Sequence, residues 1–173
     1  MPILILLVST LAFWLLYWFI RMDGLEHVAA IFDRRKREAK RLKSREAERI
    51  APLRAVDDPR DAALILMLLM ARIGHDPTRE HVAAIEATAR SVFEFDRDLT
   101  GRMTQARFIA SRADSFDHAA GLFADLLRTR LTVDERLHLI DMLGGVARIE
   151  GPSEAQSDAI DSVKRRIGLV AAH

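Results

Sequence analysis

The first twenty residues, Met1 to Ile20, contain no charged side chain. As an α-helix rising about 1.5 Å per residue, such a stretch is roughly 30 Å long, which matches the hydrocarbon core of a bilayer. The alternative is a cleaved secretory signal, which begins with Lys or Arg, has a shorter apolar core and ends at a small-residue cleavage site. None of these three features is present, so the sequence predicts an uncleaved transmembrane anchor over residues 1–20.

The residues that follow predict the orientation of this anchor. Aromatic rings favour the headgroup level of a bilayer, and Lys and Arg remain on the cytoplasmic side. Residues 21–54 hold eleven Lys and Arg against six Asp and Glu. We therefore expect the N-terminus outside a bacterial inner membrane and the C-terminal domain in the cytoplasm. The side chains expected at the membrane interface are Trp14, Tyr17, Trp18 and Arg21.

Residues 21–54 are expected to form a basic juxtamembrane helix or linker. One interpretation is a topology determinant with a solvated face, which the sequence favours. The other is contact with anionic lipid headgroups, worth about 1 kcal/mol per cation near the surface. The absence of interleaved aromatic residues argues against nucleic-acid binding. The residues expected to contact lipid are Arg34, Arg35, Lys36, Arg37, Lys40 and Arg41.

From residue 55 to 173 the charge balance reverses, with fifteen Lys and Arg against nineteen Asp and Glu. This length is sufficient for a domain with its own core. Asp58 followed by Pro59 is typical of a helix start, and residues 62–71 are ten apolar residues in succession. That run is too short to span a bilayer and predicts a buried central helix.

Capping residues predict five further helices, starting near Thr78, Thr100, Ser115, Thr132 and Ser153. No alternating pattern predicts a strand. The expected fold is therefore all-α, a compact bundle of about six helices. The residues expected on the inner faces of the five helices are Val82, Ile85, Ala89 and Val92; Met103, Ala106 and Ile109 or Ala110; Phe116, Ala120, Phe123 and Leu127; Leu137, Ile140, Leu143 or Gly144, and Ala147; and Ile160, Val163, Ile167 and Val170.

An internal repeat supports this architecture. ARIGHDPTREHVAAIE, from Ala71 to Glu86, recurs as ARIEGPSEAQSDAID, from Ala147 to Asp161, with one residue fewer in the turn. Two similar helical hairpins would pack as a pseudo-symmetric pair and bury faces that neither covers alone. The alternative is coincidence, because turn and cap chemistry alone favours Gly, Pro and Ser.

The second copy, Ile149-Glu150-Gly151-Pro152-Ser153-Glu154 leading to Ile160, resembles the TerB-like family of tellurite-resistance proteins. The resemblance covers about residues 57–170. The first copy departs from the family pattern, because Gly74-His75 stands in place of Asp-Gly. DjlA-type membrane co-chaperones also place a membrane helix before a TerB-like domain, and they end in a J-domain with a His-Pro-Asp motif. This chain has only His75-Asp76-Pro77, so the resemblance does not imply stimulation of a chaperone.

The resemblance implies a divalent-metal site formed by acidic residues at the two hairpin turns. Hard cations require several oxygen ligands at one point. The other interpretation, which the sequence favours, is that these carboxylates stabilise helix starts through the helix dipole. The candidate metal ligands are Glu150, Glu154 and Asp158, with Asp76 and Glu80 on the opposite turn.

No catalytic constellation is apparent in the sequence. Glu135 and His138 have the spacing of one half of a di-iron motif, but that site needs two such motifs, and Glu135 also fits a capping box with Thr132. There is no Cys, and we find no phosphate-binding loop or nucleophile elbow. We expect a membrane-tethered interaction module that docks a protein partner or serves as an accessory subunit of a membrane assembly. It is not expected to be an enzyme or to need a cofactor. The alternative is a metal-binding stress-response sensor.

Overall fold

The computed structural model describes residues 44–95 and 97–170. Residue contacts divide the chain into two units, Met1–Ala47 and Glu48–His173. Of the first unit only residues 44–47 are described, and they are helical and exposed. The predicted anchor and its contact residues lie outside the described residues: Trp14, Tyr17, Trp18, Arg21, Arg34, Arg35, Lys36, Arg37, Lys40 and Arg41. Among the helices that are described, none has the length and apolar character needed to cross a bilayer.

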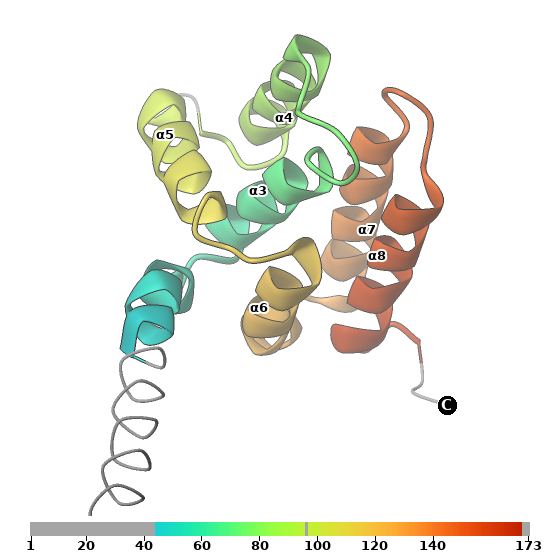
Figure 1. Cartoon of the computed structure of the whole chain (residues 1–173). Helices are drawn as coiled ribbons and strands as arrows, with labels where there is room; N and C mark the ends of the chain where they lie inside the picture. The colour runs from blue at the N-terminus through green and yellow to red at the C-terminus, as the bar shows by residue number, and fades with distance from the viewer. Residues whose placement is uncertain (1–43, 96, 171–173) are drawn as a thin grey trace, which may run out of the picture. The chain divides into compact units, whose positions relative to one another are not determined.

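The described residues form seven helices and no strands, which confirms the all-α prediction. The first helix covers residues 44–54, of which those from Glu48 onward belong to the second unit. The other six helices, labelled in Figure 1, are α3 (Pro59–Met70), α4 (Arg79–Ser91), α5 (Leu99–Ala110), α6 (Phe116–Arg130), α7 (Val133–Ala147) and α8 (Glu154–Arg166).

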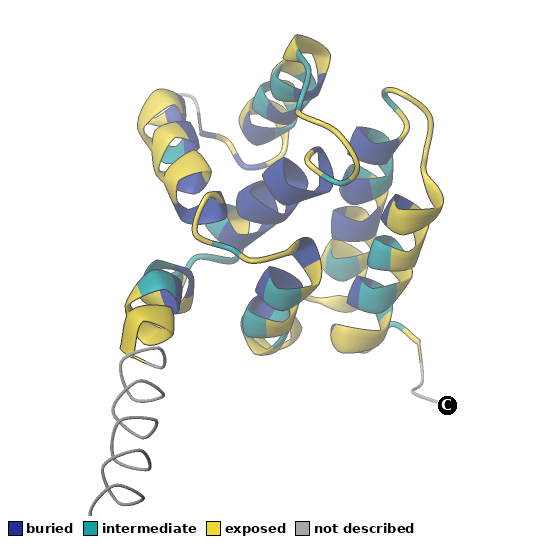
Figure 2. Cartoon of the chain, viewed as in Figure 1, coloured by how far each residue is buried: buried dark blue, intermediate teal, exposed yellow. Residues whose placement is uncertain are grey.

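Helix α3 is the centre of the second unit. It packs against α4, α5, α6 and α7, and every residue from Ala62 to Met70 is at most 5% exposed. Figure 2 shows it as a buried helix surrounded by helices with exposed outer faces. Because a helix that is apolar on all sides must be covered on all sides, this run of residues places α3 inside the bundle. The prediction of a buried central helix is confirmed.

Most predicted helix starts are N-caps in the structure. Asp58, Thr78, Ser115, Thr132 and Ser153 each accept a hydrogen bond from a backbone N–H in the first turn of their helix. The exception is α5, which begins at Leu99 after Asp98 and has no side-chain cap. Local cap chemistry therefore locates helix starts wherever a cap is used.

The inner face of α7 differs from the prediction. Leu137 is 49% exposed, and Leu139 is buried with Ile140, Leu143 and Ala147. Ile140, Leu143 and Ala147 belong to an apolar stripe with Leu137 and also to one with Leu139. Periodicity alone could therefore not decide which side of α7 faces the core.

Val92 and Val170 were also predicted to face inward, and both are exposed. Each follows the last full turn of its helix: Val92 is the C-cap residue of α4, and Val170 lies beyond α8. The helical period therefore no longer fixes the direction of either side chain.

The second unit begins seven residues before the domain start expected at residue 55. Ile50 and Leu53 are buried although they lie among charged residues. Leu53 belongs to the same core cluster as α3. The helix that contains them is therefore part of the folded domain, and its end forms one side of the groove described next.

Candidate docking groove

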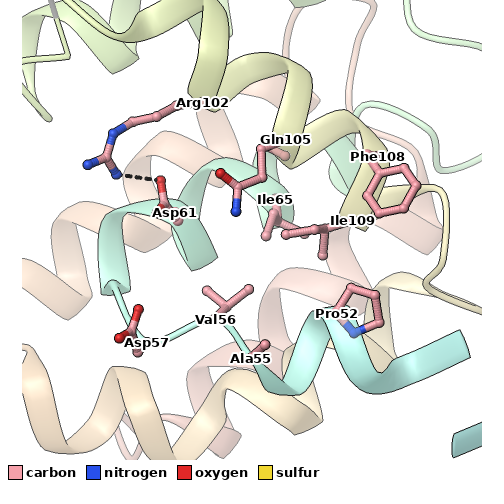
Figure 3. Close-up of a pocket in the computed structure, with 11 residues that line it drawn as sticks. Pro52, Ala55, Val56, Asp57, Asp61, Ile65, Arg102, Gln105, Phe108 and Ile109 are labelled. Atoms are coloured by element: carbon pink, nitrogen blue, oxygen red, sulfur yellow. Dashed lines mark hydrogen bonds and ion pairs between the residues drawn. The ribbon is translucent and has the colours of Figure 1, made fainter. Parts of the chain in front are cut away.

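An open groove of about 360 Å³ lies between residues 52–57 and α5, with Ile65 of α3 between them. We call it the α5 groove (Figure 3). Its two ends differ in character, because Pro52, Phe108 and Ile109 line one end while Asp57, Asp61 and Arg102 line the other. The remaining lining residues are Ala55, Val56, Gln105 and Ala106.

The apolar end presents an aromatic ring to solvent. Phe108 is 52% exposed, although Ile109 next to it is buried in the core. The guanidinium carbon of Arg112, in the turn that follows α5, lies 4.9 Å from the centroid of the Phe108 ring. This cation–π contact favours a fixed orientation of the ring. The exposed Phe108 is thus an ordered apolar contact point beside Pro52.

The polar end is built around Arg102. Its Nη1 donates to Asp61 Oδ1 at 2.8 Å and lies 3.4 Å from Asp58 Oδ2. Its guanidinium carbon lies 4.2 Å from the centroid of the buried Phe95 ring. The hydrogen bond to Asp61 raises the pKa of Arg102 above its ordinary value. Its Nε also lies 3.7 Å from Asp98 Oδ2, so Arg102 is a fixed cation already shared among three carboxylates.

Asp58 links this end of the groove to the start of α3. Partial burial raises its pKa, but hydrogen bonds from the Arg60 side chain and backbone N–H lower it, as do the charges of Arg60 and Arg102. The net effect is a pKa below the ordinary value. Asp58 is therefore the N-cap of α3 and also a carboxylate paired with two arginines.

The wall formed by the first helix is held by polar and apolar contacts. Arg49 forms a two-point ion pair with Asp114 in the loop between α5 and α6. The hydrogen bond from Arg49 lowers the pKa of Asp114. Together with buried Ile50 and Leu53, this pair fixes the helix that leads into residues 52–57. The groove is therefore a built feature of the second unit.

The candidate metal ligands lie near the two hairpin turns, and the structure brings one of them to a histidine. Glu150 Oε2 lies 3.4 Å from His75 Nε2, which joins the α7–α8 turn to the α3–α4 turn. The ring of His75 is in turn 5.3 Å from that of His81.

The five predicted ligands, Glu150, Glu154, Asp158, Asp76 and Glu80, are all exposed. Within residues 44–95 and 97–170, no three His, Asp or Glu side chains converge closely enough to hold a metal ion. The geometry therefore lends this set no support, and metal binding stays a prediction.

Two buried polar side chains close to these turns were not singled out from the sequence. His81 and Gln156 are 0% and 2% exposed, and each is the third residue of its helix, in a capping box. Gln156 also donates from Nε2 to the carbonyl oxygen of Met70 at 3.4 Å. The internal repeat could have identified them, because its alignment places His81 and Gln156 at the same position.

Glu135 has the structural role that the capping box predicted. Its Oε2 accepts from the backbone N and the Oγ1 of Thr132, both at 2.8 Å. These hydrogen bonds lower its pKa. The single Glu-x-x-His spacing of Glu135 and His138 is thus accounted for by a helix start.

Comparison with known proteins provides no further guide. No protein-family model, curated protein or solved structure matches the chain. The TerB-like resemblance therefore rests on the hairpin motif alone.

Proposed function

We propose that this chain is a membrane-tethered interaction module, with a TerB-like helical domain on the cytoplasmic side of a bacterial inner membrane. The domain docks a protein partner in the α5 groove or serves as an accessory subunit of a membrane assembly. The observation that carries this proposal is the half-exposed Phe108 beside an open groove with an apolar end. The predicted anchor at residues 1–20 accounts for the location.

Phe108 contributes to this surface without being needed for the core. The core of α5 consists of Leu99, Met103, Ala106, Ile109 and Ala110, all of them buried. An exposed aromatic ring next to a cavity is typical of a binding hot spot, because such rings bury a large apolar area at low entropic cost. Val133 and Leu137, the exposed apolar residues of α7, do not line this groove.

Site-specific photocrosslinking in cells tests the docking proposal. A photoreactive amino acid replaces Gln105, which is exposed and lines the groove, in the full-length chain. The matched control carries it at Thr129, which is exposed on α6 outside the groove. We expect a protein adduct from position 105 that is absent from position 129 and is lost when Phe108→Ala is added. Equal adducts from both positions, or none from position 105, would contradict docking in the groove.

The anchor is tested separately by deleting residues 1–20. The full chain should remain with the membranes after carbonate extraction, and the deleted chain should appear in the supernatant. Release of the full chain by carbonate would overturn the tether while leaving the groove proposal intact. No observation in the described residues favours the alternative of a metal sensor.

A further inference from the structure

We propose that the occupant of the α5 groove is an amphipathic helix of the partner protein. It places apolar side chains against Phe108 and Pro52, and a Lys or Arg one to two turns away against Asp57. This inference rests on the proposed docking function and adds the chemistry of the partner. Three features of the groove carry it: walls that offer no strand edge, its apolar end, and the carboxylates at its other end.

A helix suits the walls of this groove. The described residues contain no strand, so the domain offers no sheet edge there to which an extended peptide could add. The groove instead runs between α5 and residues 52–57, which are the end of the first helix and the turn after it, with Ile65 of α3 between them. Grooves of this kind bind the apolar face of an amphipathic helix through side chains one turn apart.

The charge at the polar end selects a cation. Four carboxylates, those of Asp57, Asp58, Asp61 and Asp98, lie there with two guanidinium groups, those of Arg60 and Arg102. Asp58 pairs with both arginines, and Asp61 and Asp98 pair with Arg102. Asp57 is exposed, and no ion pair joins it to any other described residue. The net charge of this group is negative, and Asp57 is its carboxylate without an ion pair. Asp57 lies at the same end of the groove as Asp61 in Figure 3, where a Lys or Arg of the partner would complement it.

The charge at the apolar end sets the direction of the bound helix. Arg112 lies over the ring of Phe108. A second cation placed there would be repelled, so the basic residue of the partner belongs at the Asp57 end alone. The partner sequence is thus expected to have two apolar residues three or four apart and a Lys or Arg displaced to one side of them.

Selection from a displayed library of helical peptides tests this inference. The target is the full-length chain in lipid nanodiscs, with counter-selection against the Phe108→Glu variant. Enriched peptides are then measured by fluorescence anisotropy against the wild type, Asp57→Asn and Asp57→Lys. We expect enrichment of an apolar pair with a Lys or Arg to one side. Affinity should fall several-fold in Asp57→Asn and at least tenfold in Asp57→Lys.

A charge swap provides the control against misfolding. Replacing the basic residue of the selected peptide by Glu should weaken its binding to the wild type and restore binding to Asp57→Lys. Peptides without a basic residue, peptides that bind equally to Asp57→Lys, or no enrichment over the counter-target would overturn the inference. An adduct of twice the mass of the chain from the crosslinker at position 105 would also overturn it, because the occupant would then be a second copy. A protein adduct from that position combined with failed peptide selection leaves the docking function standing.

Discussion

The α3–α4 and α7–α8 hairpins have the same turn chemistry but differ in what surrounds them. Gly74 and Gly151 both have positive φ, at +87° and +89°, and capping boxes start both α4 and α8. Yet nine successive residues of α3 are buried, whereas α7 buries five of fifteen. The turns are encoded locally, while burial depends on where each hairpin lies in the bundle.

The hairpins also differ at the buried third residue of α4 and α8. Gln156 uses both ends of its amide, because Oε1 accepts from Ser153 N and Nε2 donates to Met70 O. His81 uses Nδ1, which accepts from Thr78 N at 3.3 Å. Its Nε2 is buried and finds no hydrogen-bond partner among the described residues. The second hairpin thus satisfies a polar group that the first leaves unpaired.

The largest expected change in stability comes from truncating a buried side chain in the first helix of each hairpin. Leu66→Ala in α3 should lower the free energy of unfolding by about 3–5 kcal/mol, because a fully enclosed site cannot collapse around the cavity. Leu143→Ala in α7 should cost about 2–4 kcal/mol. Leu137→Ala, on the exposed side of α7, should stay within about 0.5 kcal/mol. Denaturant titration of the full chain in detergent, followed by circular dichroism, measures all three.

An equal loss in Leu137→Ala and Leu143→Ala would contradict the orientation of α7. Equal losses in Leu143→Ala and Leu66→Ala would show that the two hairpins share the core evenly, and a larger loss in Leu143→Ala would reverse the expected order. Either result would remove the difference in burial on which this comparison rests.

The next largest change in stability should come from the hydrogen bond that links the two hairpins, from Gln156 of α8 to Met70 of α3. Gln156→Ala removes the side chain of a capping box and the hydrogen bond to Met70 O, which together should cost about 2–3 kcal/mol. Ser153→Ala removes only the hydroxyl of the same box and should cost about 1 kcal/mol. Thermal unfolding of both variants measures the difference. Equal losses would mean that the bond to α3 contributes nothing.

The sequence predicts features that depend on neighbouring residues in the chain, and it does not predict those that depend on the packing of other helices. The caps at Asp58, Thr78, Thr132 and Ser153 follow from contacts within one helical turn, so residue order is sufficient to locate them. The inward side of α7 depends on neighbours from other helices, and for that reason the sequence favoured Leu137 over Leu139.

The α5 groove could not be predicted for the same reason. Its two walls are distant in sequence, and Phe108 reads simply as an apolar residue on the outer face of an amphipathic helix. Asp57 likewise reads as one of two acids before a proline. Only the packing of residues 52–57 against α5 gives either residue a role at the groove.

A smaller change in stability should distinguish Asp58, the charged N-cap of the first hairpin, from a neutral N-cap, because only the charged cap depends on pH. The folded state lowers the pKa of Asp58, so its ion pairs stabilise the fold above the unfolded-state pKa of about 3.9. This stabilisation is lost as pH falls through the folded pKa. Asp58→Asn keeps a capping side chain and should cost about 1 kcal/mol at pH 7, with the deficit shrinking below about pH 4.

The matched control for this prediction is Ser153→Ala, because the cap that it removes is neutral and its partner Gln156 does not titrate. Its deficit should not depend on pH over the same range. Unfolding of both variants at pH 7, 5, 4 and 3 gives the two profiles. A pH-independent deficit in Asp58→Asn would mean that the arginine pairs add nothing beyond the cap.

The smallest expected change in stability comes from exchanging His81 and Gln156, the two buried residues that the repeat aligns. Because Nδ1 of His81 accepts from Thr78, the neutral ring carries its proton on Nε2, where no described acceptor is in reach. The repeat aligns Met70 with Val146, so a Gln at position 81 would have the carbonyl of Val146 as its equivalent acceptor. His81→Gln should therefore retain the capping box and gain about 1 kcal/mol by satisfying the buried donor.

The reciprocal exchange should have the opposite sign. Gln156→His retains an acceptor for Ser153 N but loses the donor to Met70 O, and it should cost about 1 kcal/mol. Thermal unfolding at pH 8 keeps free imidazole neutral and makes the two variants comparable. Destabilisation by both exchanges would show that each site has been packed around its own side chain. The similarity of the two hairpins would then extend to the turns and caps but not to the buried contact between them.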